Sequence, residues 1–174
     1  MSGNPKHAVV TVVLNSDNPL DFDIESDDLP KDANGDLVFH NDGHPGFQVE
    51  FELDDKLELG YLFPPNNNKQ DAVWSKLGTS VCPDSPCHEV FKVQSVRPHR
   101  KSLLVLNPNS GKVLGDFGYT LRVTKTDGAP YLDLDPGGVN QNGPTQPFSK
   151  AALLIAGGVM GAVLALGAEA LLFN

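Results

Sequence analysis

Hydrophobic and polar residues alternate along several short segments of the chain. In residues 47–53 every second side chain is apolar, from Phe47 to Leu53, and those between are polar or acidic. Residues 117–123 repeat this alternation, and residues 7–14 form a mostly apolar, β-branched run. A period of two places alternate side chains on opposite faces of a strand, and a β-branched run indicates a buried strand. These segments are therefore predicted to be strands that contribute to one core.

Turn residues separate these strands from others. The pair Asn34-Gly35 favours a hairpin turn, and Pro98 lies between two apolar segments. The pattern predicts strands at 7–14, 22–28, 36–40, 46–53, 89–97, 102–107, 117–123 and 131–135. Short strands with turn signals between them are typical of a β-sandwich. The expected fold class is all-β, an antiparallel immunoglobulin-like sandwich of about seven or eight strands.

One segment departs from the strand pattern. Residues 69–77 place Val73, Trp74 and Leu77 on one side of a helix, with Asp71 near its start. A short helix packed against the sandwich is therefore predicted here. The sandwich region has no helical period long enough for a helical domain.

The composition of the chain changes after the last predicted strand. Residues 137–147 are rich in Gly, Pro, Asn and Gln, which is typical of a linker. Residues 148–174 are mostly apolar, and 151–168 carry no charge. The expected organisation is a sandwich domain over 1–136, a flexible linker over 137–147 and a hydrophobic helix over 148–174.

The hydrophobic segment favours a single-pass, C-terminal membrane anchor. As a helix, residues 151–168 would span about 27 Å, close to the roughly 30 Å of a bilayer interior. Lys150 precedes the segment, which is consistent with a cytoplasmic sandwich. Gly157 and Gly161 have the spacing of a helix-pairing motif, so residues 151–173 could also hold a homo-oligomer together. A buried helix or an assembly helix is the alternative.

The net charge argues against nucleic acid as a partner. The chain has 13 basic and 22 acidic residues, which give a formal charge of −9. An acidic surface repels phosphate backbones, and no basic stripe with interleaved aromatic residues offsets the repulsion.

Two sets of side chains have part of the spacing of a metal site. The first holds two cysteines and two histidines, Cys82, Cys87, His88 and His99. A second cysteine pair is lacking, and without a secretory signal reduced thiols are favoured over a disulfide. The second set resembles the start of a calcium loop, Asp32, Asn34 and Asp36. No bidentate glutamate follows, so a hairpin turn is favoured, and no metal or cofactor is predicted.

The end of the last predicted strand carries the candidate chemistry. Asp135 directly precedes Pro136, and two glycines follow. An aspartate carboxyl can reach its own backbone carbonyl and close a five-membered ring, while the basic proline nitrogen leaves. Such covalent participation divides one difficult hydrolysis into two easier steps. A strand that simply ends at a proline is the plain alternative.

Charged neighbours are the candidate helpers of this bond. Asp133 lies on the same strand face as Asp135, and two nearby carboxylates raise each other's pKa. If residues 125–130 form a hairpin turn, Asp135 lies opposite Thr120, with Arg122 as a diagonal neighbour. Arg122 would then hold a carboxylate ionised or stabilise an oxyanion. The predicted catalytic set is Asp135, Pro136, Asp133, Arg122 and Asp116.

The order of these features resembles the Asp-Pro endopeptidase family, small bacterial β-sandwich proteins that cut themselves. The resemblance covers residues 7 to about 140. It rests on the run 89–138, with the segments Asp-Ala-Val-Trp-Ser at 71–75 and Cys-Pro-Asp-Ser-Pro-Cys at 82–87 upstream of it.

The resemblance implies self-cleavage between Asp135 and Pro136, with possible capture of Asp135 by a lysine. No lysine lies between Lys112 and Lys125, so hydrolysis is expected instead of a cross-link. The expected function is an autoproteolytic endopeptidase acting in cis, whose cut releases the sandwich from residues 136–174. The alternative is a non-catalytic, tail-anchored module used in binding or assembly.

Overall fold

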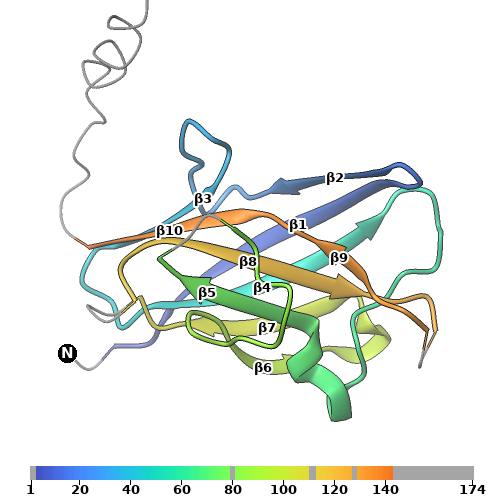
Figure 1. Ribbon diagram of the computed structural model, residues 1–174. Helices are drawn as coiled ribbons and strands as arrows, with labels where there is room; N and C mark the ends of the chain where they lie inside the picture. The colour runs from blue at the N-terminus through green and yellow to red at the C-terminus, as the bar shows by residue number, and fades with distance from the viewer. Residues whose placement is uncertain (1–2, 79–80, 110–112, 127–128, 143–174) are drawn as a thin grey trace, which may run out of the picture. The chain divides into compact units, whose positions relative to one another are not determined.

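Two five-stranded sheets pack face to face as a β-sandwich (Figure 1). The computed structural model describes residues 3–78, 81–109, 113–126 and 129–142, and ten strands lie within them. These residues belong to one unit over 1–143. The sandwich predicted from the alternating pattern is therefore confirmed, but it has ten strands in the described residues instead of the seven or eight predicted.

The strand order differs between the two sheets. The first sheet runs β2 (Leu20–Glu25), β1 (Lys6–Asp17), β4 (Phe47–Asp55), β7 (Ser102–Asn107), β6 (Lys92–Val96). The second runs β3 (Leu37–Asn41), β10 (Gly137–Asn142), β8 (Gly115–Val123), β5 (Val73–Leu77), and β9 (Leu132–Leu134) also pairs with β8.

Both sheets are mixed, so the purely antiparallel arrangement predicted from the sequence was wrong. Strands β1 and β4 pair in parallel from Lys6↔Phe47 to Leu14↔Asp55, and β10 pairs in parallel with β3. Alternation decides which face of a strand is buried, but it carries no information on strand direction. Parallel neighbours need a long connection, and β2 and β3 lie between β1 and β4 in the sequence.

The helix predicted over 69–77 was also wrong in part. A 3-10 helix, η1, covers Asn66–Ala72, and β5 begins at Val73. In β5, Val73 and Trp74 are buried as strand residues and pair with Leu121 and Thr120 of β8. A short apolar segment fits the period of a helix as well as that of a strand. Here the backbone of residues 73–77 pairs with β8, which stabilises the strand.

The linker predicted over 137–147 was wrong for its first six residues. Gly137–Asn142 forms β10, in the interior of the second sheet. The sandwich therefore extends beyond the predicted boundary at residue 136. A segment with few apolar side chains can be an inner strand because β3 and β8 satisfy its backbone from both sides. Residues 143–147 lie outside the described residues.

The hydrophobic segment also lies outside the described residues. This applies to all of 148–174, with Gly157 and Gly161, so its helix, its membrane contact and its self-association stay predictions. Within the described ranges, no helix is both long and apolar enough to cross a bilayer.

An aromatic cluster fills the space between the sheets. Phe91 lies at its centre, with its ring centroid 5.2–5.9 Å from four others, those of Phe39, Phe51, Phe117 and Tyr119. All five side chains are fully buried. All four neighbouring rings meet Phe91 edge to face, a favoured aromatic geometry. Phe117 and Tyr119 of this cluster belong to β8, and β8 pairs with the strands on both sides of Asp135 and Pro136.

Candidate functional site

The Asp135–Pro136 pair interrupts what is otherwise one strand. Strand β9 ends at Leu134, β10 begins at Gly137, and both pair with β8 in a single continuous register. This register places Asp135 opposite Thr120, as predicted from the hairpin turn. Proline has no N–H to donate, so the ladder is broken at this point although the strand direction continues.

The carbonyl of Pro136 is held from two sides. The Tyr119 amide donates to it at 3.3 Å, and the Cys82 thiol donates at 3.5 Å. The Cys82 loop is fixed nearby, because the buried Thr120 hydroxyl donates to the Pro83 carbonyl at 2.8 Å. The same loop crosses β8 so closely that a side chain at Gly118 would collide with its backbone. The residue after the candidate bond is thus firmly placed.

Asp36 lies directly beside the chain that follows this bond. A Cβ at Gly137 would collide with the Asp36 carboxylate, and the Gly137 amide donates a hydrogen bond to it. Burial raises the pKa of Asp36, repulsion from Asp32 and Asp116 raises it further, and the Gly137 hydrogen bond opposes the rise only in part. Asp36 therefore keeps its proton to higher pH than an ordinary aspartate.

Two more titratable residues contact Pro136, Tyr119 through its backbone amide and Cys82 through its thiol. Tyr119 is fully buried, and its hydroxyl has no hydrogen-bond partner among the described residues. Burial raises the pKa of Tyr119 strongly, and the charge of Asp36 adds to the effect. Burial, with the charge of Asp135, also raises the pKa of Cys82 to about 11. Cys82 is therefore a neutral thiol and a hydrogen-bond donor near pH 7, because the nucleophilic form of cysteine is the thiolate.

The side chain of Asp135 is exposed. Within the described part of the chain, we find no hydrogen bond or ion pair to its carboxylate. Its charge acts on the neighbouring Cys82 thiol. A carboxylate without a fixed partner can rotate, and one of its rotations brings it toward its own backbone carbonyl.

Arg122 and Asp133, both predicted helpers, bind each other. Arg122 Nε donates to Asp133 Oδ1 at 2.8 Å. The guanidinium is stacked between two rings, 3.8 Å from the centroid of Trp74 and 4.3 Å from that of Tyr131. The two charges are thus paired with each other two positions along the strand from Asp135, and the described residues include no contact of either with it. The predicted role of Arg122 at Asp135 stays a prediction.

Asp116, the remaining predicted helper, lies farther along the strand pair. It pairs with Val139 of β10, and its charge acts on Asp36. It therefore influences the site through Asp36. Sequence reasoning missed Asp36 and Cys82 as members of the site. The only signal for Asp36 was its place in a turn, and nothing local indicated that β3 lies beside β10.

The calcium-like segment is built as a turn. The Asp32 carboxylate accepts the amides of Asn34 at 2.8 Å and Asp36 at 3.0 Å. Its oxygen Oδ1 is thereby used on the backbone, as in an Asx turn. Cys82 and Cys87 are free thiols. Within the described ranges, no group of three or more His, Cys, Asp or Glu side chains is arranged to hold a metal ion.

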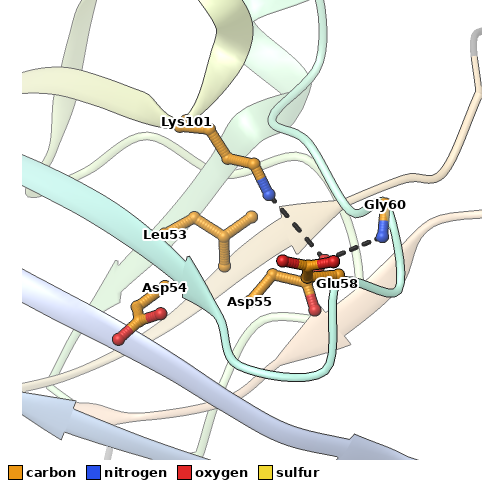
Figure 2. A pocket seen from close by; sticks show the side chains of 6 residues that line it. All are labelled: Leu53, Asp54, Asp55, Glu58, Gly60 and Lys101. Atoms are coloured by element: carbon orange, nitrogen blue, oxygen red, sulfur yellow. Dashed lines mark hydrogen bonds and ion pairs between the residues drawn. The ribbon is translucent and has the colours of Figure 1, made fainter.

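A surface cavity of about 430 Å³ lies at the end of β4, lined by Leu53, Asp54, Asp55, Glu58, Gly60 and Lys101 (Figure 2). The side chain of Asp55 is only 2% exposed. It accepts the amides of Leu59, Gly60 and Tyr61 at 2.8–3.1 Å, and Lys101 lies 3.8 Å away. Asp55 therefore acts as the anchor of the loop that follows β4.

Asp55→Ala is expected to lower the free energy of unfolding by about 1–3 kcal/mol, because three backbone amides lose their acceptor. Urea unfolding followed by fluorescence measures the loss. Asp54→Ala is the control, since Asp54 is 42% exposed and pairs only with Lys56 in the described structure. The control should change stability by less than about 0.5 kcal/mol. Equal losses in both variants would contradict the anchor role.

A scan against protein-family models found no match, and a search of curated proteins found none.

Proposed function

We propose that this chain is a self-cleaving endopeptidase that hydrolyses its own Asp135–Pro136 bond in cis. The supporting observation is the position of that bond. It interrupts a continuous strand, with an aspartate before it that is exposed and has no bonded partner among the described residues, and with the Asp36 carboxyl beside Gly137, one residue beyond Pro136.

The first step is an attack by the Asp135 carboxylate on its own backbone carbonyl carbon. One carboxylate oxygen bonds to that carbon, closing a five-membered cyclic anhydride. The bond from the carbon to the Pro136 nitrogen breaks, and that nitrogen takes up a proton. Intramolecular attack is favourable because the nucleophile is already within reach of its target.

Asp36 supplies the proton in this mechanism. Its raised pKa keeps a fraction protonated where exposed aspartates are ionised, and it lies against Gly137. It delivers the proton to the Pro136 nitrogen directly or through one water, as a general acid. In the second step, water adds to the anhydride and opens it to two carboxyl groups, so the net reaction consumes one water and each chain is cut once.

Intact-mass measurement of the purified wild-type chain tests the proposal. Incubation between pH 4 and 8 should yield two fragments, 1–135 and 136–174, whose masses sum to that of the chain plus one water. A chain that stays whole over this range, while circular dichroism shows that it is folded, overturns the proposal.

Asp36→Asn should slow the cut by about 10²-fold, the usual contribution of a positioned general acid. In the wild type, the rate should fall as pH rises through the raised pKa of Asp36, because only the protonated form donates. The variant should lose this alkaline decline. Rates come from the fragment fraction over time at each pH, and Asp54→Asn serves as the control. A wild-type rate and pH profile in Asp36→Asn would exclude Asp36 as the acid.

The second candidate function is a non-catalytic module for binding or assembly, anchored in a membrane through residues 151–173 with the sandwich in the cytoplasm. The continuous register across Asp135 and Pro136 favours it, because an intact sheet is all that such a module needs. Self-association through Gly157 and Gly161 is compatible with both proposed functions. Vesicle flotation of the full chain beside a chain ending at residue 147 tests the membrane contact.

A further inference from the structure

We propose that residues 136–174, once cut from residues 1–135, stay bound to them through β10. The partner that this surface fits is residues 137–142 of the same chain, now as a separate polypeptide. The inference rests on the proposed self-cleavage, and it changes the consequence of the cut. The tail stays attached, but by a non-covalent contact.

The backbone of β10 is bonded on both sides. It lies between β3 and β8, in parallel with Leu37–Asn41 and antiparallel to Gly115–Gly118 (Figure 1). Departure of β10 would divide the second sheet and leave two strand edges with unpaired amides and carbonyls. Open edges of this kind are unfavourable and readily take up a strand. The position between β3 and β8, called the slot below, is therefore most stable when β10 occupies it.

A buried amide pair ties β10 to the opposite sheet. Asn140 is 2% exposed, and Asn107 of β7 is fully buried. Asn107 Nδ2 donates to Asn140 Oδ1 at 2.7 Å, and the Asn140 amide returns a bond to Asn107 at 3.3 Å. Asn140 Nδ2 also donates to the Val113 carbonyl at 2.7 Å. Loss of β10 would leave the buried Asn107 side chain without this partner, which is costly.

A third buried asparagine links β3 and β10. Asn109 Nδ2 donates to the Phe39 carbonyl of β3 at 2.7 Å and lies 3.5 Å from the Gln141 carbonyl of β10. The backbone amide of Asn109 donates to Asn107 Oδ1 at 3.0 Å, which fixes the position of Asn109. The asparagines thus form one connected set that includes β10.

The slot is also selective for this particular strand. Gly138 packs so close to the Phe117 ring that a Cβ would collide with it, and Gly137 has the same relation to Asp36. The inward-facing positions of β10 are Gly138 and Asn140, both buried. Recognition is therefore by backbone pairing, by close approach at two glycines and by one buried amide, with little apolar area.

The direct experiment compares the cut protein under denaturing and native conditions. Denaturing electrophoresis should show two fragments. Size exclusion and native mass spectrometry should show one 1:1 complex that weighs one water more than the intact chain. Separate elution of the fragments from folded, cut protein overturns the inference.

A cut made by an added protease makes the test independent of self-cleavage. Asp135→Ala with a site-specific protease sequence inserted between residues 135 and 136 can be cut only by added protease. Its fold is checked before the cut by Trp74 fluorescence. Failure of the wild type to cut itself then rejects the proposed function alone, whereas release of 136–174 after the added cut rejects strand retention alone.

Asn140→Leu in this background tests the amide pair, because leucine has similar volume but no amide. The dissociation rate of the cut complex should rise at least tenfold, and Gln141→Ala, at a half-exposed position of β10, should leave it nearly unchanged. Hydrogen exchange of the uncut wild type provides a readout without substitution. Amides of β10 should be protected as long as those of β8, and fast exchange confined to β10 would contradict retention.

Discussion

Asp135→Ala is expected to abolish the cut between residues 135 and 136, with no fragment detectable by intact mass after prolonged incubation. Alanine lacks the carboxylate that closes the anhydride ring, and loss of an intramolecular nucleophile is worth roughly 10³-fold or more in rate. Asp135 is exposed, so the substitution should leave the fold and its stability almost unchanged. Loss of cleavage would therefore report chemistry and not unfolding.

Two further variants separate the ring-closure mechanism from a simple need for negative charge. Asp135→Glu keeps the charge but would have to close a six-membered ring, so it should cut far more slowly than the wild type. Asp133→Asn keeps Asp135 and removes the charge that pairs with Arg122, so it should still cut. A fragment beginning at Pro136 in Asp135→Ala, at any rate near that of the wild type, would refute the mechanism.

Phe91→Ala is expected to lower the free energy of unfolding by about 3–5 kcal/mol, the usual cost of truncating a buried phenylalanine. Phe91 is fully buried and contacts rings from both sheets, so the cavity cannot be filled by a small movement of one neighbour. Chemical denaturation followed by circular dichroism measures the change. The variant should also cut more slowly, because β8 loses support beneath the site.

The matched control for this loss is Leu57→Ala, since Leu57 is 57% exposed. It should change stability by less than about 0.5 kcal/mol. Phe91→Leu should fall between the two, because it removes less volume and no polar group is involved. If Phe91→Ala lowered the free energy of unfolding as little as Leu57→Ala, the aromatic cluster would not be a main source of the stability of the sandwich.

Local pattern was sufficient for much of the fold and for one feature of the site. The alternation from Phe47 to Leu53 predicted β4 and its buried face, and the structure buries every apolar residue of that set. The hairpin turn predicted Asp135 opposite Thr120, and the register of β9 and β10 confirms it. Both predictions succeeded because they concern one strand or two strands joined by a short turn, where period and turn chemistry set the geometry.

The remaining features depend on contacts between distant segments. Residues 137–142 have a composition typical of a linker, and they form a strand only because β3 and β8 offer backbone partners on both sides. Asp36 lies about a hundred residues from Gly137, and only the parallel pairing of β3 with β10 brings them together. Arg122 is bonded to Asp133 and stacked between two aromatic rings, and no local pattern indicated that the Trp74 ring from another strand would lie against it.

The sequence by itself determined that this protein is a β-sandwich, where most of its strands lie, and that its single Asp-Pro bond ends one of them. Only the tertiary structure decided strand direction, the inner place of β10 and the position of the Asp36 carboxylate beside Gly137. The physical reason is that side-chain period and turn residues act locally, whereas sheet order and burial arise from the whole chain packing at once.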